Sequence, residues 1–185
     1  QAGTIFTSSD NGTTWTSRTS GTSIQLTGVT YGNGLFVTVV YSGIILTSSD
    51  NGTTWTSRTS GTSSNLFEVT YANGTFVAVG DSGTIFTSTN GTSWTSRTSG
   101  TNQSLYEVTY GNSTFVTVGT SGTILTSSNG TTWTSRTSGT SYNFNGVTYG
   151  NSTFVTVGDS GTILTSSDNG TSWTSRTSGT TLDRK

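Results

Sequence analysis

The sequence contains no cysteine, proline, methionine or histidine. Without cysteine the chain has neither a disulfide framework nor thiolate metal ligands, and its redox compartment stays open. Because the chain begins at Gln1 and not at a methionine, we expect that it is processed or that further residues precede it. A cleaved secretion signal would fit this start.

Charge is scarce as well: 8% of the residues are charged, and 7 basic against 8 acidic side chains give a formal net charge of −1. A nucleic acid backbone requires a basic surface, so nucleic acid is not an expected partner. No apolar run approaches the ~20 residues that span a bilayer, and no charged amphipathic helix is visible. We therefore expect no membrane insertion.

Serine, threonine and glycine dominate what is present, with 25 glycines in 185 residues. Such polarity is typical of disordered chains. Aromatic residues nevertheless make up 11% of the sequence, and the apolar residues recur in register. We therefore expect a folded protein.

The sequence is a tandem repeat in which each unit contains one tryptophan. The tryptophans lie 40, 39, 39 and 40 residues apart, at Trp15, Trp55, Trp94, Trp133 and Trp173. This period is typical of one four-stranded propeller blade per repeat. We predict a single repeat domain over 1–185, with repeats at 1–22, 23–62, 63–101, 102–140 and 141–181 and a tail at 182–185.

One repeat shows why the unit should consist of strands, which we name A to D in chain order. Residues 66–71 are rich in strand-forming residues and are followed by Asn73-Gly74, which favours a tight hairpin turn. Strand B, at 75–79, is apolar on both faces, as expected between two neighbouring sheets. Turns at 80–83 and at Asn90-Gly91 lead to strand C at 84–88 and strand D at 92–99. Each complete repeat should be a four-stranded antiparallel meander.

The link from strand D to the next strand A, such as residues 61–65, favours a propeller. Five residues at ~3.3 Å each reach roughly 17 Å, and crossing a four-stranded sheet takes three gaps of ~4.8 Å. The link therefore suits a step from the outer edge of one blade to the inner edge of the next. A parallel β-helix is the less favoured alternative, because its coils are shorter and would not contain two Asn-Gly turns per repeat.

Three stretches around the tryptophans resemble the Asp-box, or bacterial neuraminidase repeat. Residues 8–15 and 48–55 read Ser-Ser-Asp-Asn-Gly-Thr-Thr-Trp, and residues 166–173 differ only at Ser172. The flanking strands also look like Asp-box propeller blades, so the resemblance covers nearly the whole chain.

The resemblance implies an all-β propeller of five Asp-box-like repeats, in which each box is a structural hairpin between strands C and D. Its aspartate would accept backbone hydrogen bonds, and its tryptophan would pack over the hairpin. The implied structural residues are Ser8, Asp10, Gly12, Trp15, Ser48, Asp50, Gly52, Trp55, Ser166, Asp168, Gly170 and Trp173, together with Trp94 and Trp133.

The third and fourth repeats depart from this pattern. Residues 88–91 and 127–130 form shorter turns that lack the aspartate. We expect a plain two-residue Asn-Gly turn to replace the box there.

Catalysis is not expected. Sialidases of the resembling superfamily use a converging arginine triad, whereas the arginines here share one repeat position and would form a ring: Arg18, Arg58, Arg97, Arg136 and Arg176. Glycoside hydrolysis also needs two carboxylates at a set separation, and Glu68 and Glu107 occupy equivalent positions on neighbouring repeats. The Ser-Asp-Asn-Gly turns lack the alternating carboxylates of a calcium loop. We expect no metal and no cofactor.

Hairpin direction places the A–B turns and the Asp-box turns on one face, and the B–C turns and D–A links on the other. The second face varies most between repeats, and loops on one face of a rigid repeat scaffold commonly bind ligands. The candidate ligand-binding residues there are Gln25, Tyr41, Asn65, Asp81, Gln103, Tyr142, Asn143 and Asp159. Neutral drift in solvated loops explains any single one of them equally well.

We expect a non-catalytic binding module, secreted or on the cell surface, whose ligand is a glycan or a protein. One alternative is a purely structural repeat propeller without a ligand, of engineered or near-consensus origin. Another is a protein-binding assembly factor for a membrane complex, a role that related Asp-box propellers have.

The strand count predicts an incomplete first blade. The chain opens with a strand C at residues 4–7, so it holds five C–D hairpins but four A–B hairpins. The first repeat should be a half blade whose unpaired edge invites another strand. Upstream residues or another chain would fill this edge, or the ring would close around four full blades with the half blade as an appendage. We favour upstream residues, with self-association next.

Overall fold

The computed structural model describes residues 3–181. Within these residues it contains four sheets of four antiparallel strands and one sheet of two. Residues 1–22 hold the two-stranded sheet, called the half blade, and the next four repeats hold blades 1 to 4, while the predicted tail at 182–185 lies outside the described residues. The all-β fold with four-stranded blades, predicted from the repeat period, is confirmed.

The strands follow the same order A to D in every complete blade. The half blade consists of β1 (Thr4–Thr7) and β2 (Thr16–Thr19), and blade 1 of β3 (Leu26–Gly32), β4 (Leu35–Val40), β5 (Ile44–Ser48) and β6 (Thr56–Thr59). Blade 2 consists of β7 (Leu66–Ala72), β8 (Thr75–Gly80), β9 (Ile85–Ser88) and β10 (Thr95–Arg97). Blade 3 consists of β11 (Leu105–Gly111), β12 (Thr114–Gly119), β13 (Ile124–Ser127) and β14 (Thr134–Arg136). Blade 4 consists of β15 (Phe144–Gly150), β16 (Thr153–Gly158), β17 (Ile163–Ser166) and β18 (Thr174–Arg176).

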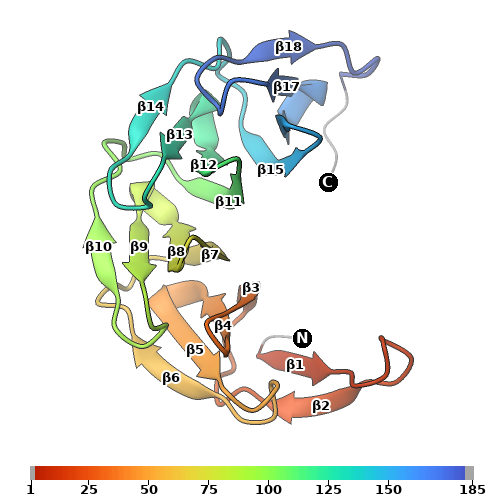
Figure 1. Ribbon diagram of the computed structural model, residues 1–185, viewed down its shortest axis with the longest axis vertical. Helices are drawn as coiled ribbons and strands as arrows, with labels where there is room; N and C mark the ends of the chain where they lie inside the picture. The colour runs from red at the N-terminus through yellow and green to blue at the C-terminus, as the bar shows by residue number, and fades with distance from the viewer. Residues whose placement is uncertain (1–2, 182–185) are drawn as a thin grey trace.

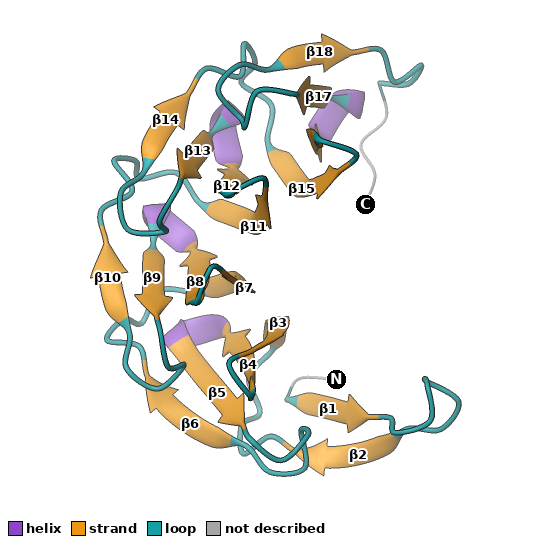
Figure 2. Ribbon diagram, in the orientation of Figure 1, coloured by secondary structure: helices purple, strands orange, loops and turns teal. Residues whose placement is uncertain are grey.

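The five sheets follow an open arc (Figure 1). The A strands β3, β7, β11 and β15 lie along its inner side, and the D strands lie along its outer side. Short 3-10 turns connect strands B and C in each complete blade, η1 (Tyr41–Gly43), η2 (Asp81–Gly83), η3 (Thr120–Gly122) and η4 (Asp159–Gly161) (Figure 2). Blade 4 and the half blade face each other across the opening, so residues 3–181 do not close a ring. The alternative of a ring closed around four full blades, with the half blade as an appendage, is therefore wrong.

The hydrophobic core lies between neighbouring blades. Because successive side chains of a strand point to opposite faces, Phe76 and Ala78 of β8 pack on blade 1 while Val77 and Val79 pack on blade 3. All four side chains are fully buried. This two-sided packing explains why strand B is apolar at every position, and each buried valine contributes about 1.5–3 kcal/mol relative to an exposed one.

The A–B turns are tight hairpin turns, as their Asn-Gly sequences predict. Asn33 and Gly34 both have positive φ, at 49° and 76°, which is the type I′ conformation. Asn112 and Ser113 adopt the same conformation, with φ of 44° and 60°. The Asn33 side chain also donates a hydrogen bond to the Thr89 carbonyl at 3.3 Å, and this bond joins the A–B turn of blade 1 to the C–D turn of blade 2.

The complete Asp-boxes close their hairpins through the aspartate. The backbone N–H and the hydroxyl of Thr54 donate to the two carboxylate oxygens of Asp50 at 2.9 and 2.7 Å, and Ser48 donates its hydroxyl at 2.8 Å. The Thr54 backbone N–H, followed by the Thr54 and Ser48 hydroxyls, lowers the pKa of Asp50 from 3.8 to about 2. The boxes of the half blade and of blade 4 contain the same bonds around Asp10 and Asp168.

The shorter turns of blades 2 and 3 keep the box and exchange its acceptor. The Asn90 side-chain oxygen accepts the backbone N–H groups of Thr92 and Ser93, both at 2.9 Å. A plain type I′ turn would need positive φ at both central residues, but in this turn only Gly91, at 71°, has it. The expectation of a plain two-residue turn is therefore wrong, because the asparagine amide takes the place of the carboxylate.

Each box tryptophan folds back on its own hairpin. The indole N–H of Trp94 donates to the Gly91 carbonyl at 3.0 Å, and its ring packs on Phe76 with centroids 6.2 Å apart. Trp94 is half-buried, whereas Trp15 of the half blade is 62% exposed. The tryptophans therefore cover the edges of the interblade cores.

Candidate protein-binding surface

The predicted ligand-binding residues lie together on the face formed by the 3-10 turns and the D–A links. Backbone hydrogen bonds join each turn to the link of its own blade, such as Tyr41 N–H to Gln25 O at 3.2 Å and Asp81 N–H to Asn65 O at 2.9 Å. We call this face the turn rim.

Asp81 connects two blades at the turn rim. Its carboxylate accepts the Asn65 amide at 2.8 Å and the hydroxyl of Ser104, from the link into blade 3, at 3.0 Å. Asn65 in turn accepts the backbone N–H of Ser42 in η1 at 3.0 Å. These bonds form a continuous latch across blades 1 to 3.

Blades 3 and 4 repeat this latch with other residues. The Asn143 side-chain oxygen accepts the Ser121 N–H of η3 at 3.0 Å, while its amide donates to Asp159 at 2.9 Å. Gln103 accepts the Thr120 hydroxyl at 2.8 Å. Side-chain hydrogen bonds within the chain therefore hold five of the predicted residues: Asn65, Asp81, Gln103, Asn143 and Asp159. Their role as ligand contacts stays a prediction.

Gln25 and Tyr142 are the most exposed members of the predicted set. Tyr142 is 51% exposed, and its carbonyl accepts the Gly122 N–H at 2.8 Å. Tyr41 differs from both, because its ring is half-buried and takes part in an aromatic cluster.

That cluster is a row of three rings where the turn rim meets the inner side of the arc, along which the A strands lie. Tyr41 of blade 1 packs edge-on against Phe67 of blade 2, with centroids 5.9 Å apart. Phe67 packs against Tyr106 of blade 3 at 5.4 Å. Such pairs contribute about 0.5–1.5 kcal/mol beyond the burial of their area. The aromatic row, Tyr41–Phe67–Tyr106, gives three blades one continuous apolar strip.

A β-bulge positions two of these rings. The pairing of β7 with β8 passes from Leu66 opposite Gly80 to Glu68 opposite Val79, so Phe67 is the extra residue. Tyr106 is the extra residue at the same place in β11. A bulge re-aims the side chain that it carries, which explains how these rings leave the regular alternation of strand A.

Two half-buried carboxyl groups adjoin the aromatic row. Burial raises the pKa of Glu68 from 4.5 to about 7, although the Val69 backbone N–H, at 2.9 Å from its Oε1, lowers it; the nearby Glu107 raises it further. Burial also raises the pKa of Glu107. A Cβ built on Gly28 would lie 2.6 Å from Oε1 of Glu68, so Glu68 lies over a site of blade 1 that only glycine leaves open.

Basic residues lie elsewhere. Every basic residue among residues 3–181 is an arginine on strand D, at the outer side of the arc. In each repeat the arginine Nε donates to a threonine hydroxyl of the adjacent strand C, as Arg97 does to Thr87 at 2.7 Å. The arginines therefore do not converge.

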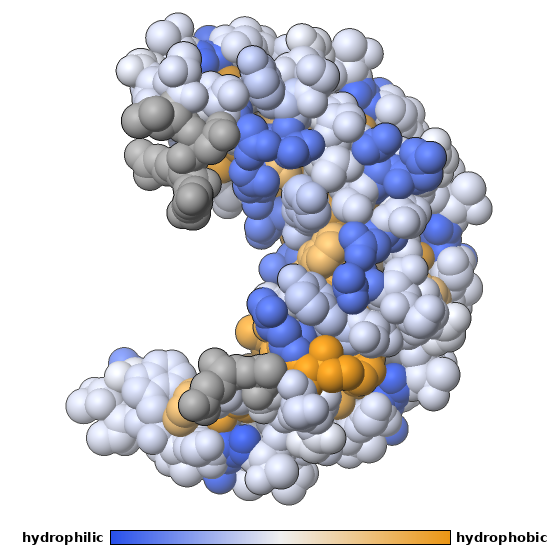
Figure 3. Space-filling view, turned by 180° about the vertical axis from the view of Figure 1, so that it is seen from behind, coloured by the Kyte–Doolittle hydropathy of each residue, from blue (hydrophilic) through white to orange (hydrophobic). Residues whose placement is uncertain are grey.

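In the space-filling view, hydrophilic side chains gather along the inner margin of the arc, with an apolar patch beside them (Figure 3).

The arrangement suits binding. The three partly exposed aromatic rings and the adjoining carboxyl groups of Glu68 and Glu107 are the kinds of groups that contact apolar side chains and hydrogen-bond donors. Phe67 and Tyr106 were not among the predicted residues, because the alternation of strand A does not reveal the bulge that carries them. The one available signal was a large aromatic residue at a position that holds Thr27 in blade 1 and Asn145 in blade 4.

Neither a metal site nor a membrane-crossing helix is present in the described part of the chain. No group of three or more Asp, Glu, His or Cys within residues 3–181 could hold a metal ion. None of these residues forms a helix with the length and apolarity that a membrane crossing needs.

Comparison with known proteins gives a family. The family model described as photosynthesis system II assembly factor YCF48 matches residues 1–184. No curated protein matches the chain. The family is described by an assembly role, which supports the non-catalytic prediction at the level of the family.

Three solved structures have similar folds. A YCF48 structure bound to D1 peptide has a TM-score of 0.72 and 18% identity, over 92% of this chain and 59% of that chain. YCF48 from Cyanidioschyzon merolae has a TM-score of 0.65 and 18% identity, over 82% of this chain and 56% of that chain. The computationally designed protein Ika4 has a TM-score of 0.66 and 14% identity, over 79% and 92%. These identities show the fold alone, and the chain spans less than two thirds of either YCF48 chain.

Two expectations change with the family. The predicted extracellular or cell-surface location is wrong, because the family is described by the assembly of photosystem II, which takes place inside photosynthetic cells. The glycan ligand also gains no support from this description, whereas the protein-binding assembly factor, given above as an alternative, agrees with it.

Proposed function

Because the chain belongs to the family described as photosynthesis system II assembly factor YCF48, we propose that it is a non-catalytic assembly factor that binds a segment of a photosystem II polypeptide. The aromatic row, Tyr41–Phe67–Tyr106, is the proposed contact. The segment lies along the inner side of the arc at the turn rim and inserts apolar side chains against the three rings.

The continuity of the row over three blades is the observation that carries this proposal. Interface energy concentrates in a few aromatic anchors on rigid surfaces. The latch through Asn65 and Asp81 fixes the rim around the rings, so little ordering is needed on binding. Glu68 and Glu107 add acceptors for the donors of a bound segment, and no arginine competes for them.

The D1 peptide is the probe for this proposal, because a YCF48 structure of similar fold contains it. Fluorescence anisotropy with a labelled D1 peptide would measure its Kd for the chain. We expect Phe67→Ala and Tyr106→Ala each to weaken binding about tenfold, the effect of losing about 1.4 kcal/mol. Both rings are partly exposed, so the variants should remain folded.

Tyr31→Ala is the matched control. Tyr31 is 59% exposed and also packs on one ring, Phe36 at 4.7 Å, but it lies near the opposite end of its strand A. We expect this variant to bind the peptide like the unaltered chain. The proposal fails if the unaltered chain does not bind the D1 peptide, or if Tyr31→Ala weakens binding as much as Phe67→Ala does.

A further inference from the structure

Asparagine followed by glycine occurs eight times in the sequence, and this dipeptide is chemically reactive. The glycine nitrogen, once it has lost its proton, attacks the side-chain carbonyl carbon of the asparagine, because glycine has no side chain to hinder the approach. A five-membered succinimide ring forms and ammonia leaves. Water then opens the ring at either carbonyl and gives aspartate or isoaspartate. The surroundings of each dipeptide therefore decide where this deamidation occurs.

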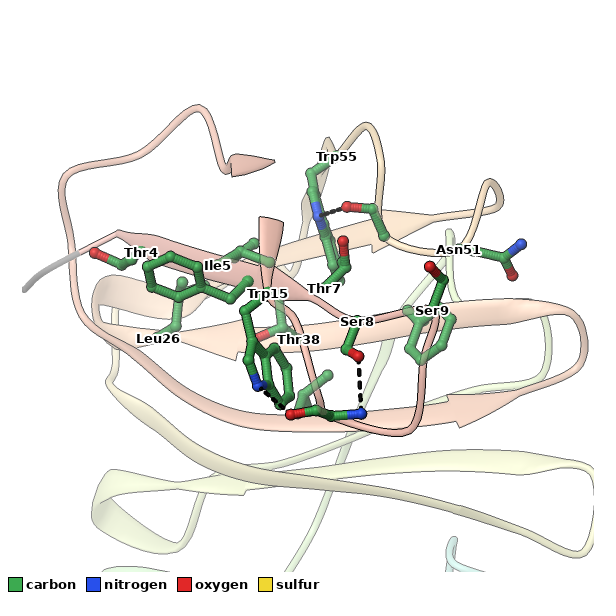
Figure 4. Close-up of a pocket in the computed structure, with 15 residues that line it drawn as sticks. Thr4, Ile5, Thr7, Ser8, Ser9, Trp15, Leu26, Thr38, Asn51 and Trp55 are labelled. Atoms are coloured by element: carbon green, nitrogen blue, oxygen red, sulfur yellow. Dashed lines mark hydrogen bonds between the residues drawn. The ribbon is translucent and has the colours of Figure 1, made fainter. Parts of the chain in front are cut away.

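Five of the eight dipeptides lie in the boxes, and there a serine hydroxyl holds the nitrogen that would attack. In blade 2 the Gly91 N–H donates to Ser88 Oγ at 2.8 Å, and the other four box glycines donate to their own serine in the same way. Figure 4 shows this bond as the dashed line at Ser8 of the half blade. An N–H committed to such a bond keeps its proton, and ring closure has to break the bond first.

Burial adds to this protection in the complete blades. The box glycines buried there are Gly52, Gly91, Gly130 and Gly170. A Cβ built on Gly91 would lie 3.1 Å from Cδ1 of Leu35 in the preceding blade, so solvent base does not reach this nitrogen and the packed neighbours resist its movement. The Asn90 side-chain oxygen is also fixed, since it accepts the N–H groups of Thr92 and Ser93.

A sixth dipeptide, Asn145-Gly146, lies inside strand A of blade 4. The Asn145 amide donates to Asp159 at 2.8 Å, and Gly146 pairs with Val157 in the sheet. The strand therefore fixes both partners of the reaction.

The A–B turns of blades 1 and 2 carry the two dipeptides that lack this protection. No hydrogen bond of the described residues involves the N–H of Gly34 or Gly74. Both glycines are exposed, and a Cβ built on either would meet no atom within 4 Å. The Asn33 amide still donates to the Thr89 carbonyl, whereas Asn73 is exposed and no hydrogen bond within residues 3–181 holds its side chain. Asn73-Gly74 is therefore the least restrained dipeptide.

We propose that Asn73 is the site at which the folded chain deamidates first, with Asn33 second, and that the box serines keep the box asparagines intact. Each event consumes one water and releases one ammonia. Aspartate adds a negative charge to the A–B turn of blade 2. Isoaspartate adds a backbone carbon atom to the same turn, in which Asn73 and Gly74 have φ of 49° and 73°, and so disrupts its type I′ conformation.

Asn73 and Asn90 form a matched pair for the test, because both precede Gly-Thr and both lie in the tryptic peptide 59–97. The full chain is kept folded in mildly alkaline buffer for several weeks, samples are digested at mildly acidic pH, and mass spectrometry measures acid and amide at each residue. We expect Asn73 to convert at least about tenfold faster than Asn90, since Asn90 has both the hydrogen bond and burial against it. In urea, where the local sequence sets the rate, the two should convert alike.

Ser88→Ala tests the role of the hydroxyl, because it frees the Gly91 N–H of blade 2 alone. We expect Asn90 to convert at least about fivefold faster, the effect of one lost hydrogen bond, while Asn51 in the box of blade 1 stays unchanged. Asn51 also reports folding, and if it converts faster as well, the comparison of Asn73 with Asn90 in the unaltered chain decides alone. The inference is overturned if Asn90 converts as fast as Asn73 in the folded chain, or if folded Ser88→Ala converts Asn90 no faster.

Discussion

The same valine occupies four equivalent positions with different surroundings, and truncating each to alanine tests the account of the core. Val39, Val79 and Val118 are fully buried between blades, whereas Val157 on the outer face of blade 4 is 47% exposed. Strand propensity changes alike at all four positions, so it cancels in the comparison. The difference between sites then reports burial.

The expected magnitudes follow from the packing. Valine to alanine removes two methyl groups, a transfer loss of about 1.6 kcal/mol at ~0.8 per group, and a closed site adds a cavity term. We expect Val39→Ala, Val79→Ala and Val118→Ala to lower the free energy of unfolding by about 2–3 kcal/mol. Val157→Ala loses about half of the transfer term and leaves no cavity, so we expect less than about 1 kcal/mol.

Urea denaturation followed by tryptophan fluorescence measures these differences, provided that the dependence on urea stays the same between variants. If Val157→Ala lowered the free energy of unfolding as much as Val118→Ala does, the reasoning would be refuted, since the outer face of blade 4 would then be covered in solution. Equal small losses at all four sites would instead refute the interblade core itself.

Two further predictions concern groups that the fold leaves half-covered. Glu68 keeps its proton in the folded state up to a pKa of about 7 but loses it near 4.5 when unfolded, so stability should fall as pH rises from about 4.5 to 7. Denaturation midpoints at pH 5 and 7.5 should differ less in Glu68→Gln, and an unchanged difference would contradict a titrating Glu68. Trp94→Ala should cost about 2 kcal/mol, below the 3–5 of a fully buried aromatic, and Trp15→Ala less than about 1, because Trp15 is 62% exposed. Equal losses in thermal or urea unfolding would show that the shared indole hydrogen bond, and not burial, sets the contribution.

Local features of the blade were predictable because short-range chemistry decides them. The Asn-Gly turns require positive φ, the two-sided apolar strand B requires neighbours on both faces, and the Asp-box closes through bonds within five residues. The strand order A to D and the incomplete first blade follow from the same patterns. Even here one inference failed, since Asn90 works as a side-chain acceptor, a role that Asn-Gly in sequence does not distinguish from a type I′ turn.

The sequence by itself therefore determined the blade, its turns and its repeat, since these depend on contacts within about 40 residues. Only the tertiary structure decided which equivalent residues are covered. Val29 and Val147 occupy the same repeat position, yet one is 62% exposed and the other 6%, because only one has a complete blade before it. Likewise, the bulges bring Phe67 and Tyr106 together, and the neighbouring link turns Asp81 into a latch. Burial between repeats depends on which blade stands next to which, and no pattern within one repeat records that.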